Sequence, residues 1–260
     1  MARDNWTEEQ ITIVLYEYCR NPFGQFSSTK IFVKELGQLI GRSPAAIVRK
    51  VGNLASFDPQ MKARGVGGLG HTGKLDEVIW NRYFGHWDQL AYEAESLIAK
   101  FKEKELEESL EESLSIDLSD LPQGKERKQE VKRRINQDFF RRTVLSSYNY
   151  KCCITGINNL DLIQASHIVG WSKDEENRTN PQNGLCLNIL FHKAYDENLL
   201  GISPDYEIFI SERFFGERLK DVDQGTIDYI RGFDHQKLIL PRRFYPDKDM
   251  LASHFEKFYV

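Results

Sequence analysis

Apolar residues recur at helical spacing through the first hundred residues, and this pattern predicts a helical N-terminal part. Thr7, followed by polar residues up to Gln10, is typical of a helix start, and the run ITIVLYEYC continues that helix. A second helix is expected over IFVKELGQLI, and it stops at Gly41. Ser43 can cap the next helix, and Pro44 suits its first turn because a missing N–H costs nothing there. This third helix is expected to run through AAIVRKVGNL.

The second and third helices are joined by a tight glycine turn, which predicts a helix-turn-helix-like pair. Their apolar side chains are expected to pack together and to leave basic residues outside, on the side of a recognition helix. The expected DNA-binding residues of this pair are Arg42, Arg49 and Lys50. The alternative is an ordinary helical hairpin with solvated basic residues. The expected packing residues are Leu36, Leu39 and Ile40 on one helix and Ile47, Val48 and Val51 on the other.

Three parts are expected along the chain. Residues 1–100 are a helical domain with a glycine-rich break at 63–73. Residues 101–122 are an acidic stretch with leucines four residues apart, which predicts an amphipathic helix or a loosely ordered linker. Residues 123–260 form the third part. In the first part, the aromatic residues Trp80, Tyr83, Phe84 and Trp87 are expected in the core rather than on a base-stacking platform.

The third part changes from helical spacing to short strands, so the chain as a whole is expected to be an α+β protein. The segment QEVKRRINQDFFRRTVLSSY predicts a helix with basic residues outward. NNLDLIQASHI and GLCLN predict strands, ILFHKAYDENL a helix, and LLGISPDYEIFIS a hairpin around residues 203–205. DKDMLASHFEKFYV predicts a final helix. The inward residues of the basic helix are expected to be Val131, Ile135, Phe139 and Val144.

The composition excludes several classes of protein. Hydrophobic residues make up 40% and aromatic residues 12% of the chain, which suits a globular core. No apolar run approaches the ~20 residues that span a bilayer, and the polar start MARDNWTEEQ has no signal-peptide apolar region. Four cysteines are too few for a secreted disulfide scaffold, so a cytoplasmic location without a membrane partner is expected.

The net charge of −4 conceals two segments of opposite sign. Residues 101–122 hold two lysines against eight acidic residues, whereas residues 125–151 hold nine Lys/Arg against three acidic residues. A basic stripe next to a catalytic segment is where phosphates would have to lie. The stripe's expected DNA-binding residues are Arg133, Arg134, Arg141 and Arg142.

Three polar residues mark the segment 148–210 as a candidate catalytic site. Hydrolysis of a phosphodiester requires a base that activates water and a cation that neutralises charge on the phosphate. His167, at the end of a strand, is the candidate base, and His192, on the first turn of a helix, is the candidate metal ligand. Asn183 can tie the long loop between them closed and hold the backbone of the base in place.

The phrases YNYKCCITG, LIQASHI, NPQNGLCLN and LFHKAYDENLLGI resemble the HNH nuclease family, with its ββα-metal fold, and in particular restriction-type bacterial HNH endonucleases. Arg134, Gln137 and Phe140 fit the R-x-x-Q-x-x-F pattern that precedes the Cys-x-x-Thr-Gly turn in that subgroup. The resemblance covers about residues 123–260. Residues 5–98 are similar to the helical module that often precedes such a nuclease domain.

The resemblance implies that His167 is the general base, Asn183 the central Asn and His192 a metal ligand. Many relatives carry a metal-binding Asp before the base, where this chain has Ser166. The second ligand therefore stays open among Ser166, Asn183, a backbone carbonyl and water. The implied metal is Mg²⁺, for which Mn²⁺ or Ni²⁺ can substitute. Structural zinc is not expected, since Cys152, Cys153 and Cys186 form no paired C-x-x-C motifs; Cys152 and Cys186 are expected in the core.

These features predict a metal-dependent endonuclease that cuts double-stranded DNA, and the resemblance implies restriction or defence as its role. One such unit cuts one strand, so double-strand cleavage predicts a homodimer or two binding events. Lys173, in the loop between base and Asn, is expected to contact phosphates, or else the loop is only solvated. Asp196 is either a helper of the metal ligand or bonded to the next loop. The alternatives are a DNA-binding regulator with a vestigial nuclease domain, an RNase or toxin, and a homing enzyme.

Overall fold

The computed structural model describes residues 5–65, 73–119, 121, 124–216 and 218–258. The chain divides into two compact units, residues 1–146 and 147–260. Most of the predicted glycine-rich break at 63–73, and the expected boundary at 122–123, lie outside the described residues. No helix within the described ranges is both long enough and apolar enough to cross a membrane.

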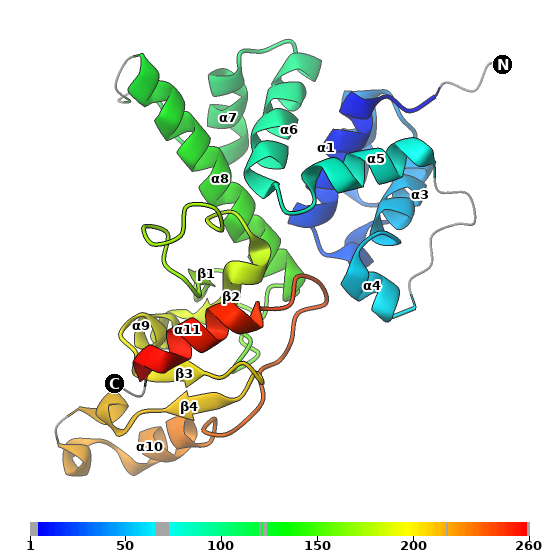
Figure 1. Ribbon diagram of the computed structural model, residues 1–260. Coiled ribbons are helices and arrows are strands. Elements are labelled where there is room, and N and C mark those ends of the chain that lie inside the picture. The colour runs from blue at the N-terminus through cyan, green and yellow to red at the C-terminus, as the bar shows by residue number, and fades with distance from the viewer. Residues whose placement is uncertain (1–4, 66–72, 120, 122–123, 217, 259–260) are drawn as a thin grey trace. The chain divides into compact units, whose positions relative to one another are not determined.

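The first unit is helical, and α1 (Glu8–Arg20) lies at its centre, where it packs against α3, α5 and α6 (Figure 1). Thr7 caps α1 in a reciprocal capping box with Gln10, as the sequence predicts. The other elements are η1 (Phe23–Gln25), α2 (Ile31–Ile40), α3 (Pro44–Ala55), α4 (Pro59–Ala63), α5 (Lys74–Tyr83), α6 (Trp87–Phe101), α7 (Leu106–Leu114) and α8 (Lys125–Ser147).

The turn between α2 and α3 is as tight as its sequence predicts. Gly41 ends α2 in the left-handed conformation, with φ 68°, and the Ser43 side chain accepts a hydrogen bond from the backbone of Ala46 at the start of α3. A Cβ added at Gly37 would lie only 2.5 Å from the carbonyl oxygen of Arg42. The helical hairpin is therefore confirmed, although Leu39 and Val48 are only partly buried, unlike Leu36, Ile40, Ile47 and Val51.

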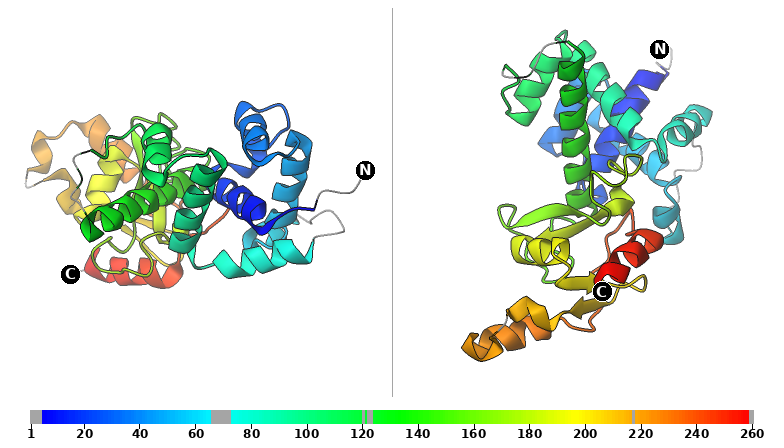
Figure 2. Two further views of the ribbon diagram at one scale, coloured as in Figure 1. Left: turned by 90° about the horizontal axis from the view of Figure 1, so that it is seen from above. Right: turned by 60° about the vertical axis from the view of Figure 1, so that its left-hand side comes forward.

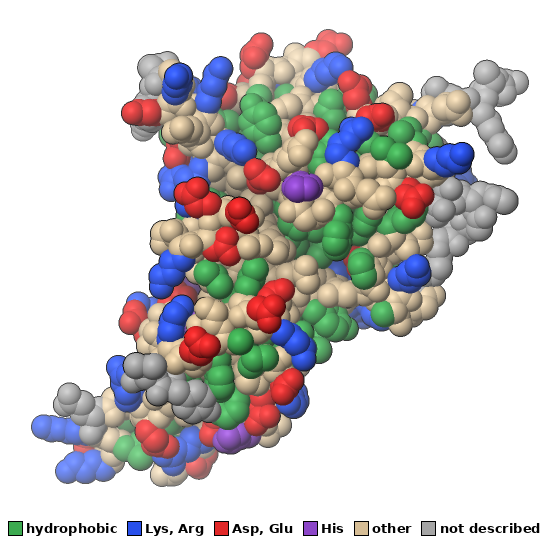
Figure 3. Space-filling model, viewed as in Figure 1, with side chains coloured by type: hydrophobic (Ala, Val, Ile, Leu, Met, Phe, Trp, Pro, Cys, Tyr) green, Lys and Arg blue, Asp and Glu red, His purple; other side chains and the backbone are tan. Residues whose placement is uncertain are grey.

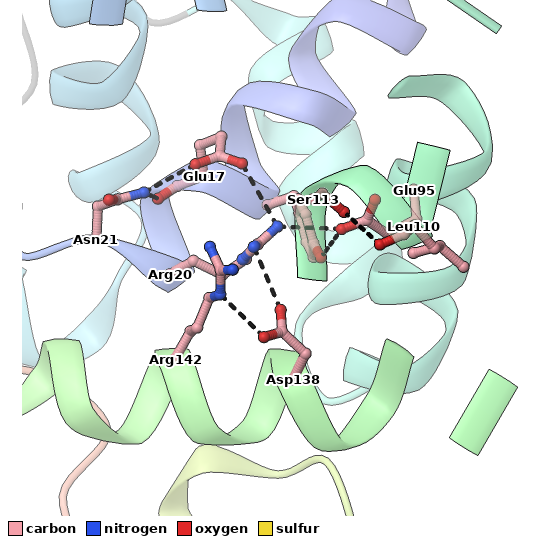
Figure 4. Close-up of polar contacts among 9 residues, drawn as sticks. Glu17, Arg20, Asn21, Glu95, Leu110, Ser113, Asp138 and Arg142 are labelled. Atoms are coloured by element: carbon pink, nitrogen blue, oxygen red, sulfur yellow. Dashed lines mark hydrogen bonds and ion pairs between the residues drawn. The ribbon is translucent and has the colours of Figure 1, made fainter. Parts of the chain in front are cut away.

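A buried network of charges joins α1, α6 and α8 (Figure 4). The guanidinium of Arg20, which is 6% exposed, lies 3.1 Å from Glu95, 3.3 Å from Asp138 and 3.6 Å from Glu17. Arg142 also donates to Asp138, at 2.9 Å. Because an unpaired charge is costly to bury, these contacts fix the three helices in one arrangement.

The region between residues 74 and 146 continues the helical first unit. Gly85, with φ 86°, lies between α5 and α6, and of the four aromatic residues near it only Phe84 is exposed. The acidic stretch does not stand apart, because α7 packs against α6 and Leu110 is buried. The basic helix α8 also groups with the first unit, and its predicted inward residues are buried.

Among its described residues, the second unit contains two small antiparallel sheets and three α-helices. Strands β1 (Ile163–His167) and β2 (Gly184–Asn188) pair, and α9 (Ile189–Asp196) packs against both. Strands β3 (Leu200–Ile202) and β4 (Ile208–Ile210) form the predicted hairpin, and α11 (Lys248–Phe258) packs against β3 (Figure 2). The remaining elements are η2 (Pro181–Asn183), η3 (Glu212–Phe215), η4 (Leu219–Asp221) and α10 (Gln224–Arg231), which the sequence pattern did not predict.

A stacked pair of rings joins α11 to α9. The His254 imidazole lies on the Tyr195 ring with centroids 3.8 Å apart and planes 9° from parallel. Both side chains are buried. Since Tyr195 lies one turn from the candidate ligand His192, this stack helps to hold the helix that carries it.

Candidate active site

The site is built on the β1–β2 pair and α9, in the predicted strand, strand, helix order. In the register of the pair, Ser166 lies opposite Leu185 and His167 lies opposite Gly184. The candidate base His167 is therefore in the last residue pair of the sheet. Strand β2 is buried throughout, and Asn188 at its end caps α9 by accepting from the Phe191 backbone at 2.9 Å. The fully buried strand β2 therefore forms a rigid support for the elements that carry His167 and His192.

His167 is held in one tautomer by a backbone carbonyl. Its Nε2 lies 3.0 Å from the carbonyl oxygen of Arg178, which can only accept, so Nε2 carries the proton and Nδ1 the lone pair. Burial lowers the pKa of His167 below 6.5, against smaller opposing effects of this hydrogen bond and of Asp196. The edge of Trp171 also contacts the ring, with centroids 5.7 Å apart. The role of Arg178 had no signal in the sequence, since any residue type offers a carbonyl.

Asn183 ties the loop between β1 and β2 closed, as predicted. Its side chain is fully buried, with Oδ1 accepting from the Val169 backbone at 2.8 Å. Its Nδ2 donates to the carbonyls of Val169, at 3.0 Å, and Asn177, at 3.1 Å. The backbone carbonyl of Asn183 also accepts from Ile168, next to the candidate base. These bonds leave the buried amide no exposed face, which argues against the alternative that Asn183 is a metal ligand.

His192 and Ser166 meet across the site. Nδ1 of His192 lies 2.9 Å from the Ser166 hydroxyl oxygen, and its Nε2 lies 3.5 Å from Oδ2 of Asp196, one turn along α9. The His192 ring is partly exposed, Ser166 is fully buried, and Asp196 is open to solvent. His192 and Asp196 also act electrostatically on His167, which places the three side chains in one neighbourhood.

The donor set fits a divalent cation with few protein ligands. Within the described residues, no group of three or more His, Cys, Asp or Glu side chains is arranged to hold a metal. His192 and neighbouring oxygens can contribute two ligands, and Mg²⁺ commonly keeps several waters and uses substrate phosphates for the rest. The residues present therefore fit a metal that is completed by water and substrate.

The three cysteines of this unit are core residues. Cys152, Cys153 and Cys186 are fully buried. The Cys152 sulfur accepts from the backbone N–H groups of Asn188, at 3.3 Å, and Thr155, at 3.5 Å. Burial raises the pKa of Cys153 well above its usual range, so this thiol stays protonated near neutral pH. Packing around β2 therefore accounts for these residues.

One basic residue of the helical hairpin lies inside rather than outside. Lys50 was expected outside, but it is 7% exposed and its Nζ forms an ion pair with Asp76 at 2.5 Å. A partner 26 residues further along the chain draws this lysine inward. Arg42 bonds to Gln10 at 2.9 Å and stacks on Trp6, whereas Arg49 is exposed. The DNA-binding role of these two arginines stays a prediction.

The four arginines of α8 that are expected to bind DNA are exposed, and three of them are paired within their own helix. Arg133 and Arg134 contact Glu130, and Arg142 contacts Asp138; Arg141 is exposed. Figure 3 shows acidic side chains lying among the basic ones on the face viewed. Exposed pairs of this kind contribute little stability, so a phosphate can compete for the arginines. In the second unit, Lys173 is exposed in the loop after β1, next to Trp171, whose carbonyl accepts from Arg178 at 2.6 Å.

Comparison with known proteins agrees with this geometry. A family model described as HNH endonuclease matches residues 152–203, a segment that contains β1, β2, α9 and every residue of the site described above. No curated protein matches the chain. Residues 152–203 are therefore similar to the HNH endonuclease family, and this similarity supports a nuclease that hydrolyses phosphodiester bonds.

Proposed function

We propose that this protein is a metal-dependent DNA endonuclease in which His167 activates the attacking water. The hydrogen bond from Nε2 of His167 to the Arg178 carbonyl carries the proposal, because it fixes the lone pair on Nδ1. On this proposal Nδ1 removes a proton from water, whose oxygen attacks phosphorus in line while the 3′ oxygen leaves. The products are 5′-phosphate and 3′-hydroxyl ends.

The environment of His167 suits a base that works near neutral pH. Burial lowers its pKa, so the imidazole is unprotonated at pH 7 and ready to accept a proton. Asn183 positions it from the other end of the loop by holding Val169, two residues beyond the base. Asn183 therefore acts on the reaction through His167 and touches neither water nor phosphate.

His192 is the residue through which a divalent metal would be held. When bound, Mg²⁺ stabilises the charge that develops on the phosphate and on the leaving oxygen, and Mn²⁺ or Ni²⁺ can replace it. On this proposal the Ser166 hydroxyl, 2.9 Å from Nδ1 of His192, accepts the Nδ1 proton and so directs the Nε2 lone pair of the ring outward. On this proposal Ser166 orients the ligand rather than serving as one.

We infer double-stranded DNA as the substrate and restriction or defence as the role. Support comes from the helical hairpin α2–α3, with Arg49 exposed, since a helix fits the major groove of B-form DNA but not of A-form RNA. The exposed arginines of α8 and Lys173 in the loop would contact phosphates without reading sequence. Cleavage of both strands then needs a homodimer or two successive events.

The test is cleavage of supercoiled plasmid by the full chain with Mg²⁺, with Mn²⁺ and with EDTA, on modified and unmodified DNA, beside a matched RNA. The wild type should nick or linearise DNA only with metal. His167→Ala should lower the rate about 10²- to 10⁴-fold. His235→Ala, an exposed histidine of the same unit, is the control and should be unchanged. Cleavage of RNA alone, or equal rates for His167→Ala and wild type, would overturn the proposal.

A further inference from the structure

The residue that precedes the candidate base His167 in the sequence lacks the carboxylate that a divalent cation prefers. This residue is Ser166, whose hydroxyl is fully buried and already 2.9 Å from His192. A neutral oxygen in this position attracts Mg²⁺ or Mn²⁺ far less than a carboxylate does. Any charged protein ligand for the metal must therefore come from elsewhere in the site.

Asp196 supplies a carboxylate one helical turn from His192. Residues four apart on a helix lie on the same face, so both side chains project from α9 to the same side. Unlike Ser166, Asp196 is 48% exposed, so its second oxygen and the surrounding space are open to water and substrate.

The two side chains lie close enough to reach one cation and are farther apart than in a charge-assisted hydrogen bond. Nε2 of His192 and Oδ2 of Asp196 are 3.5 Å apart, whereas a charge-assisted hydrogen bond is about 2.7–2.9 Å long. Two donors that each lie about 2.1 Å from one ion are separated by about 3.0 Å in an octahedral and about 3.4 Å in a tetrahedral arrangement. In the tautomer of the proposed function, in which Nδ1 of His192 donates to Ser166, the Nε2 lone pair can serve this ion.

We propose that Asp196 is the second protein ligand of the catalytic metal and forms, with His192, a two-residue chelate on one face of α9. The assignment deepens the proposed function and rests on it. It moves Ser166 from the ligand set to the residue that orients His192. It also places the two ligands on one rigid helix, so the geometry of the chelate does not depend on the loop that carries the base.

The experiment measures Mn²⁺ binding to the full chain without DNA, by titration calorimetry and by the electron paramagnetic resonance signal of free Mn²⁺. Asp196→Asn removes the charge at constant size and should weaken binding at least about tenfold. Glu197→Gln removes the neighbouring exposed carboxylate, which pairs with Lys193, and is the matched control. Its affinity should stay within about twofold of wild type.

Asp196→Cys separates direct ligation from a general charge effect. A thiolate in contact with the metal favours soft cations, so this variant should gain affinity for Cd²⁺ with a sulfur-to-metal absorption band, and Glu197→Cys should not. Wild-type affinity in Asp196→Asn, or equal weakening in Glu197→Gln, would overturn the assignment and leave the proposed function standing. If the wild type itself binds no Mn²⁺, the metal requirement of the proposed function fails as well.

Discussion

The lowered pKa of buried His254 predicts that the second unit loses stability in acid. Its ring is buried against Tyr195, and burial, together with the charges of Lys257 and Lys173, lowers its pKa from 6.5 to about 4. The folded state therefore binds the proton less readily than the unfolded state. The stabilisation is complete above pH 6.5 and is lost as the pH falls from 6.5 toward 4.

The size of this effect follows from the two pKa values. The interval between 6.5 and about 4 corresponds to about 3 kcal/mol in full. Between pH 7.5 and pH 5, the linkage relation gives a loss of about 2 kcal/mol in the free energy of unfolding. His254→Phe keeps a ring on Tyr195, but the new side chain cannot titrate. Between pH 7.5 and pH 5, the free energy of unfolding of this variant should therefore fall by about 2 kcal/mol less than that of the wild type.

The assay is urea unfolding at each pH, read by pulses of a dipyridyl disulfide, which labels exposed thiols even in acid. Buried Cys153 reports on the second unit and buried Cys19 on the first. The pH dependence of the unfolding free energy measured at Cys153 should differ between wild type and His254→Phe. The pH dependence measured at Cys19 should be the same in both proteins. Equal losses at Cys153 in both proteins would show that His254 is not held neutral, and the reasoning would be refuted.

Three further predictions concern the remaining structure. Arg20→Met leaves three carboxylates of the buried network without their shared partner, so the first unit should lose about 3–5 kcal/mol, measured by the urea midpoint at Cys19. Gly37→Ala places a Cβ 2.5 Å from a backbone oxygen and should cost about 1–3 kcal/mol, whereas Gly52→Ala, in open space on α3, should stabilise by about 0.5–1 kcal/mol; equal effects would contradict the turn geometry. The rate of DNA cleavage should rise with pH and level off with an apparent pKa below 6.5, because burial favours neutral His167; an inflection above 6.5 would exclude it as the base.

Local signals in the sequence were sufficient for much of the fold and for the frame of the site. The capping box of α1 and the turn at Gly41 depend on residues within four or five positions of each other, so both can be predicted from the sequence alone. The same holds for the strand, strand, helix order around His167, Asn183 and His192, which spans one short segment.

Long-range partners explain what the sequence did not predict. The helical periodicity places Lys50 on the exposed face of its helix, and only the tertiary fold brings Asp76 close to it. The tautomer of His167 depends on a backbone carbonyl, and the distance from His192 to Asp196 on side-chain conformations, neither of which a residue pattern encodes.

The bonds of Asn183 divide the connection between β1 and β2 into a fixed part and a free part. Residues 169, 171, 177 and 178 are anchored near the base, while residues 172–176 between those anchors are mostly exposed. Lengthening such an exposed segment costs little, about 0.6 kcal/mol for each doubling. Evolution, or an engineer, can therefore rebuild this segment to contact a different DNA target without retuning the hydrolytic step.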